Sequence, residues 1–84
     1  MDRAIFDLNL GVEATSLYIL ACAIIDQGET ATLERIRLQW NASEQDLFHA
    51  IEVLIDRGVL AAESPVHERE SLHINPKEKW RPLT

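Results

Sequence analysis

One stretch of the chain, residues 32–75, constrains the fold more than any other. It holds two short amphipathic segments separated by a break at Asn41-Ala42, then Gly58, and then two runs of β-type residues. Apolar residues recur every three to four positions in the first two segments, which predicts helices. The later runs are short and bounded by turn-forming residues, which is typical of strands. The expected order is therefore helix, turn, helix and hairpin.

The second of these helices has the clearest start signal in the chain. Ser43 is followed three residues later by Asp46, a spacing at which a hydroxyl and a carboxylate satisfy unpaired backbone N–H groups. We expect this helix over residues 43–57, ended by Gly58, and the preceding helix over residues 32–40. Apolar residues recur along one face of the later helix at Leu47, Ala50, Ile51 and Leu54.

A longer helix is expected over residues 13–27. Its residues from Leu17 to Ile25 are all apolar, so every side of that stretch needs cover. One core in an 84-residue chain can hardly supply it, which makes the surplus face a candidate for self-association or for docking a partner. Before this helix, apolar and other residues alternate from Phe6 to Val12, which predicts a short extended segment.

The C-terminal third is expected to form a hairpin over residues 59–75, followed by a basic tail over residues 76–84. The hairpin strands should cover residues 59–63 and 71–74, since Pro76 cannot donate a hydrogen bond to a strand ladder. The tail should be loose unless Trp80 packs on the core. Trp40, at the end of a helix, is more typical of a core residue. The whole chain is thus expected to be a single α+β domain over residues 1–84.

The net charge of −6 is unevenly distributed. Residues 1–42 carry three basic and six acidic groups (−3), residues 43–75 carry two and seven (−5), and residues 76–84 carry three and one (+2). A negative domain is repelled by phosphate at long range, so nucleic-acid binding would require basic groups to cluster locally.

Cysteine content and hydropathy restrict the class of protein. A single cysteine, Cys22, forms no disulfide within the chain. The apolar run Leu17–Ile25 is too short for a bilayer, which needs roughly 20 residues. The residues before it are acidic and lack the basic segment of a secretory signal. We expect a cytoplasmic protein that makes no membrane contact.

No group of residues has the pattern of a catalytic or metal site. Cys22 and the three histidines, His49, His67 and His73, lack the spacing of zinc ligands. A thiol inside an apolar helix is also a poor nucleophile, because burial raises its pKa. The sequence therefore predicts no enzymatic activity, no metal and no cofactor.

Over about residues 13–75 the chain resembles the winged helix-turn-helix superfamily, as in small bacterial regulators of the MarR type. The resemblance rests on three helices, the break Asn41-Ala42-Ser43, the hairpin "wing" and the helix end Leu54-Ile55-Asp56-Arg57-Gly58-Val59-Leu60. In that helix end, three residues separate a leucine from a glycine, which two apolar residues follow. The same fold also serves as a protein-docking module, so the resemblance specifies the fold better than the function.

The resemblance implies a regulator that contacts DNA as a dimer. In the family's usual mode, the helix over residues 43–57 enters the major groove and the wing touches phosphates. Asp46, Glu52 and the acidic wing disfavour that mode here. The candidate nucleic-acid contacts are Arg35, Arg37, Gln45, His49, Arg69, Lys77, Lys79 and Arg81.

Local charge favours a second function, which is docking of a protein. A basic or apolar partner would meet the acidic and apolar face of the helix over residues 43–57, whereas in the DNA-binding regulator the helix over residues 13–27 would supply the dimer contact. The family resemblance favours the regulator, and the charge pattern favours the docking module. The candidate interface residues are Tyr18, Cys22, Ile25, Phe48, Val53 and Trp80.

Overall fold

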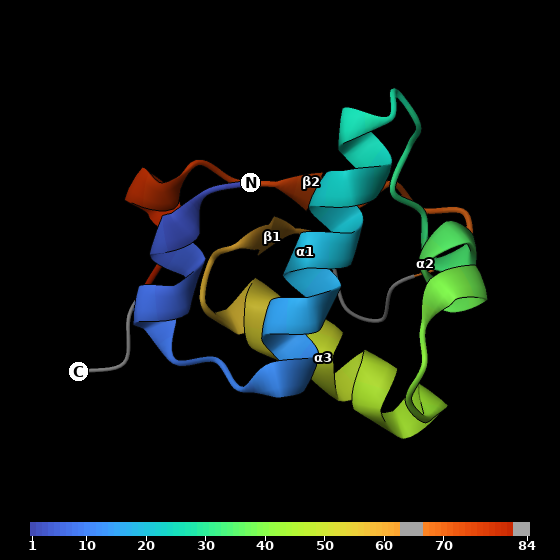
Figure 1. The fold of residues 1–84 in the computed structure, drawn as a ribbon, viewed down its shortest axis with the longest axis horizontal. Coiled ribbons are helices and arrows are strands. Elements are labelled where there is room, and N and C mark those ends of the chain that lie inside the picture. The colour runs from blue at the N-terminus through green and yellow to red at the C-terminus, as the bar shows by residue number, and fades with distance from the viewer. Residues whose placement is uncertain (63–66, 82–84) are drawn as a thin grey trace.

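The computed structural model describes residues 1–62 and 67–81, and within them it shows a small α+β domain (Figure 1). The expected combination of helices with a short antiparallel sheet is confirmed. In chain order the elements are η1 (Arg3–Leu8), α1 (Val12–Asp26), α2 (Leu33–Gln39), α3 (Glu44–Asp56), β1 (Leu60–Ala61), β2 (His73–Ile74) and η2 (Lys77–Lys79), where η denotes a 3-10 helix.

Side-chain caps define where α2 and α3 begin. The Ser43 hydroxyl accepts a hydrogen bond from the backbone N–H of Asp46 at 3.1 Å, which confirms the predicted start of α3. The Thr32 hydroxyl caps α2 in the same way, accepting from the N–H of Arg35 at 3.2 Å. Each cap satisfies one of the N–H groups that the first turn of a helix leaves unpaired. All three α-helices therefore start and end within a residue of the expected positions.

The expected extended segment before α1 is wrong, because these residues form η1. The Asp2 carboxylate starts this helix by accepting a hydrogen bond from the N–H of Ala4 at 2.9 Å. Ile5 and Leu8 are both buried. A 3-10 helix has three residues per turn, so residues three apart share a face. The alternation of apolar residues concealed this spacing.

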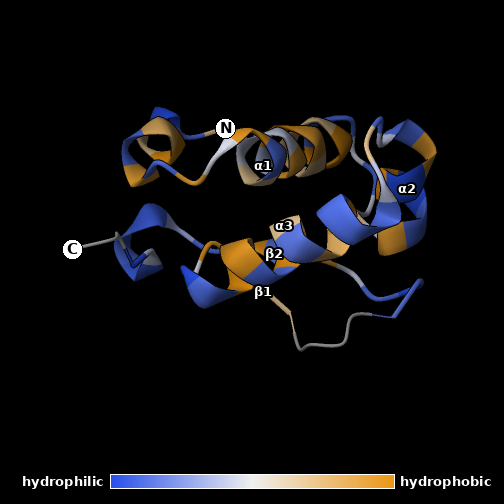
Figure 2. Cartoon of the chain, turned by 90° about the horizontal axis from the view of Figure 1, so that it is seen from below, coloured by the Kyte–Doolittle hydropathy of each residue, from blue (hydrophilic) through white to orange (hydrophobic). Residues whose placement is uncertain are grey.

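The domain has two layers, with α1 and η1 on one side and α3 with the sheet on the other (Figure 2). α1 packs directly on α3, and α2 closes one end between the layers (Figure 1). The core forms where the apolar sides of α1 and α3 meet, with Leu17 and Leu47 fully buried between them. Leu54 on α3 points inward as the sequence predicts.

The hairpin pairs as expected but its strands are shorter. β1 and β2 are antiparallel, with Leu60 opposite Ile74 and Ala61 opposite His73. On its other side, the returning segment forms a bridge from Ser71 to Thr32, in the connector between α1 and α2. The returning segment thus lies between that connector and β1. The outer part of the expected first strand, including Glu63, falls outside the described residues.

The C-terminal tail is packed on the core instead of loose. Trp80 is only 9% exposed, and its ring meets that of Tyr18 edge-on, with centroids 5.6 Å apart. The indole N–H donates to the carbonyl of Asn75 at 2.9 Å. Gly58 makes this closure fit, since a Cβ there would lie 2.4 Å from the carbonyl oxygen of Lys79. Its φ of +74° is also a conformation that favours glycine.

No helix in the part of the chain that the structure describes is long and apolar enough to cross a membrane.

Candidate functional site

The outer face of α3 is acidic, with apolar residues at its two margins. Opposite the buried side of the helix, four exposed residues follow one another at spacings of three or four. Phe48, 40% exposed, flanks this line on one side, and the half-buried Val53 flanks it on the other. Glu44 and Asp46 add two exposed carboxylates in the first turn. The residues of the line are Gln45, His49, Glu52 and Asp56.

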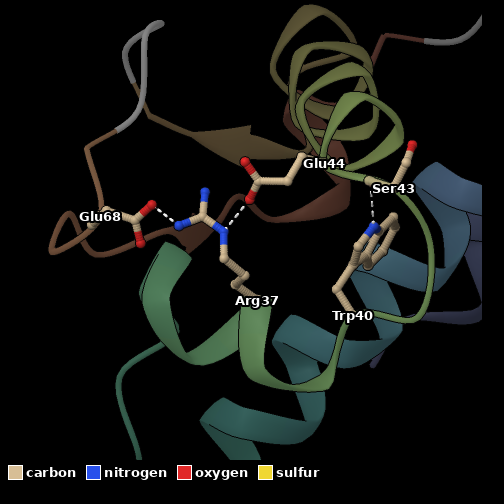
Figure 3. A network of polar contacts seen from close by, with 5 residues as sticks. All are labelled: Arg37, Trp40, Ser43, Glu44 and Glu68. Carbon is tan, nitrogen blue, oxygen red and sulfur yellow. Dashed lines mark hydrogen bonds and ion pairs between the residues drawn. The ribbon is translucent and has the colours of Figure 1, made fainter.

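Arg37 on α2 lies beside the start of α3, between Glu44 and Glu68 (Figure 3). Its guanidinium forms ion pairs with Glu44 at the start of α3 and with Glu68 in the hairpin loop. The same group lies over the Phe48 ring, 5.9 Å from its centroid. Arg37 thus connects α2, α3 and the hairpin loop, and holds Phe48 in place at the edge of the outer face.

Three arginines among the candidate phosphate contacts already have acceptors within the chain. Arg37 is held by its two carboxylates, and Arg35 pairs with Glu29. Arg81 donates to the last carbonyls of α3, reaching the Asp56 oxygen at 2.6 Å. Unpaired carbonyls at a helix C-terminus carry partial negative charge, which explains why a guanidinium settles there. These three arginines are therefore already engaged by groups of the chain itself.

The remaining basic candidates are exposed but scattered. Lys77 and Lys79 lie on η2, and Arg69 lies in the hairpin loop beside the Glu68 partner of Arg37. Figure 1 shows η2 and α2 at opposite ends of the domain. Gln45 and His49 lie on α3 as expected. The fold therefore does not gather these remaining basic candidates around the helix that the resemblance expects to read DNA.

The structure corrects the assignment of three candidate interface residues, because their side chains belong to the core. Tyr18, Cys22 and Trp80 are all buried. Burial raises the pKa of the Tyr18 hydroxyl to about 12 and also raises the pKa of the Cys22 thiol. This side of α1 is covered by η1, which the sequence does not predict, and by the tail, which packs through Trp80. Ile25 and Phe48 remain exposed.

The structure offers no metal centre in residues 1–62 and 67–81: no three histidine, cysteine or acidic side chains there are placed to hold an ion. His67 and His73 are exposed, and Cys22 lies in the core.

Part of the surplus apolar face predicted for α1 forms one wall of a groove whose other wall the sequence does not predict. The groove lies between the outer face of α1 and the turn after α2, and Ile19 and Trp40 line it. Trp40 is only half-buried, with its indole N–H donating to the carbonyl of Ser43 at 3.0 Å. The available signal was the spacing of Val12, Ser16, Ile19 and Ala23, which places them on one side of α1.

Comparison with known proteins leaves the site to be judged on its own geometry: no protein-family model matches the sequence, and no curated protein or solved structure is significantly similar to the chain.

Proposed function

We propose that this chain is a winged-helix variant that docks a basic protein partner on the outer face of α3. The order of the elements supports the winged-helix assignment, since three helices precede an antiparallel hairpin. The isolated bridge between Thr32 and Ser71 supports it further, because it pairs the connector after α1 with the returning segment of the hairpin. α3 then occupies the position of the recognition helix, and its outer face is where a ligand is expected.

The observation that favours a protein partner over DNA is that the arginines are bonded to acceptors within the chain. The four carboxylates of α3, at Glu44, Asp46, Glu52 and Asp56, are exposed and set the local field. The arginines that would offset them are tied to acceptors of the chain itself. A phosphate backbone approaching α3 therefore meets repulsion, whereas a basic protein surface is attracted.

Phe48 supplies the apolar contact that such a partner needs. Aromatic residues that become buried in a partner's pocket often carry much of the binding energy of an interface. The ring is exposed for contact on one side, and Arg37 covers it on the other. The partner is then a basic surface with an apolar pocket for this ring.

The test compares what the native chain and two variants retain from a cell extract. Phe48→Asp removes the apolar ring of the proposed contact, whereas Leu38→Asp makes the same kind of change at an apolar residue of α2 that is 82% exposed. The Phe48→Asp variant should no longer retain the partner protein from the extract, and the Leu38→Asp variant should retain it as the native chain does. Equal retention by both folded variants, or a retained fraction composed of nucleic acid, would contradict the proposal. Thermal melting confirms that each variant is folded.

A further inference from the structure

The groove on the α1 side is separate from the face of α3 and has a volume of about 520 Å³. Val12, Ser16, Ile19 and Ala23 form one wall, and the turn from Trp40 to Ala42 forms the other. Val12 is 78% exposed and Ile19 39% exposed, so this side of α1 has no cover from the described residues. Volumes of this size are typical of sites that take in a ligand or a few side chains.

The charges around the groove have one sign. Among the described residues that line it, Glu13 is the only charged one. Asp26 is exposed on the same side of α1, seven residues after Ile19 and hence two turns further along. An apolar strip between two carboxylates favours an occupant with apolar side chains at its centre and cations at its ends.

A second copy of the chain fits these charges poorly. In an antiparallel pair of α1 helices centred on Ile19, Glu13 of one copy would lie near Asp26 of the other. In a parallel pair, Glu13 would face Glu13. Like charges in contact weaken an association.

The elements that line the groove favour a helix as the occupant. An extended peptide usually binds by adding to an exposed strand edge, and the lining residues belong to α1, α2 and the turn after α2. A row with steps of four, three and four residues along α1 instead forms the ridge on which a second helix packs. Ser16 and Ala23 are small enough to let the two backbones approach.

We infer that this groove binds one amphipathic helix of another protein, with basic residues at both ends of its apolar stripe. Its apolar side chains, spaced by three or four residues, fill the space between Ile19 and Trp40. Its lysine or arginine side chains lie beside Glu13 and Asp26. The inference does not depend on the proposed function, because the outer face of α3 takes no part in it.

Two designed helical peptides with the same apolar stripe test this site, one with arginines and the other with glutamates at its ends. Nuclear magnetic resonance of the isotope-labelled protein follows the binding. The chain has two tryptophans, and their indole N–H signals report on different places. The basic peptide should shift the Trp40 signal and the amides of the outer face of α1, while the signal of the buried Trp80 stays unchanged. The acidic peptide should leave both unchanged.

Variants sharpen the result. Ile19→Lys should weaken the basic peptide roughly tenfold or more, and Ile19→Glu should weaken it less, since the new carboxylate attracts the peptide. Val12→Lys, at a more exposed position, repeats the test if Ile19→Lys fails to fold. Leu38→Lys, on the 82% exposed leucine outside the lining, and Phe48→Asp are the controls and should bind as the native chain does.

Three results would overturn the inference. The first is the absence of any Trp40 shift with the basic peptide, and the second is equal binding of the acidic peptide. The third is sedimentation of the protein at twice its mass of 9.6 kDa in a form that Ile19→Lys dissociates, which would make a second copy the occupant.

Discussion

The two ends of α3 are held by different kinds of contact. At its C-terminal end, Gly58 and Trp80 close the chain against the core, and Arg81 binds the last carbonyls of the helix. At its N-terminal end, Arg37 and its carboxylate partners are on the surface. Buried aromatic packing contributes several kcal/mol, whereas an exposed ion pair contributes about 0.2–1 kcal/mol. The C-terminal end therefore sets stability, and the N-terminal end is the one available for contact with other molecules.

Truncating the tail tryptophan should have the largest effect on stability. Trp80→Ala removes a buried aromatic ring and its contact with Tyr18, so the free energy of unfolding should fall by about 3–5 kcal/mol. Urea unfolding followed by circular dichroism measures the change. Trp80→Phe keeps most of the apolar packing and should lose less. A loss below 1 kcal/mol for Trp80→Ala would show that the tail does not hold this end.

Substituting the glycine under the tail should come next. Gly58→Ala forces a side chain into a left-handed backbone conformation and against the carbonyl of Lys79, so it should destabilise the fold by at least about 2 kcal/mol. Gly28→Ala is the matched control, because its φ is also positive but no atom lies within 4 Å of its Cβ position. If urea unfolding shows the same decrease in the free energy of unfolding for both variants, the close approach of Lys79 to Gly58 does not contribute to the effect.

Alkaline pH should weaken the C-terminal end. Burial raises the pKa of Tyr18 to about 12 in the folded protein, against about 10 when unfolded, so the fold favours the neutral hydroxyl. This contribution is fully present below pH 10 and is lost as the pH rises to about 12, at a cost on the order of 2 kcal/mol. Melting of the native chain and of Tyr18→Phe across that range tests it, with Cys22→Ala in both to remove the thiol. Parallel pH profiles would contradict the assignment.

The N-terminal end should give the smallest change in stability. Arg37→Met keeps the apolar stem but removes the ion pairs with Glu44 and Glu68, so it should cost less than about 1 kcal/mol at low salt and less still at high salt. Urea unfolding at two ionic strengths shows this. A loss comparable to that of Trp80→Ala, and insensitive to salt, would erase the difference between the two ends.

The bounds of α3 and the character of its outer face could be predicted from local signals in the sequence. The cap at Ser43, the apolar spacing from Leu47 to Leu54 and the stop at Gly58 all depend on neighbours in the sequence, so the bounds of α3 followed from them. The acidic outer face and the exposure of Phe48 followed from the same helical spacing.

The contacts that hold the two ends of α3 could not be predicted, because they join residues far apart in the chain. Arg81 reaches carbonyls 25 and 26 residues away, and Arg37 meets Glu68 across 31 residues. No periodicity in the sequence encodes such pairs, so the sequence does not reveal which acceptors engage these arginines. The tail covers Tyr18 by the same kind of contact, so that side of α1 was taken for an interface. The groove beside Trp40 likewise needed the placement of α2 against α1.

The central claim is that the folded chain presents no cationic surface to DNA. Titration of a fluorescently labelled random duplex at low salt tests it most directly, because even a weak attraction to phosphate is detectable when little salt screens it. With the arginines held by the chain's own acceptors and the carboxylates of α3 exposed, the anisotropy should stay flat at all protein concentrations. A saturable rise that disappears steeply as salt is added would contradict the account, since it would show that the folded chain presents a cationic surface to DNA.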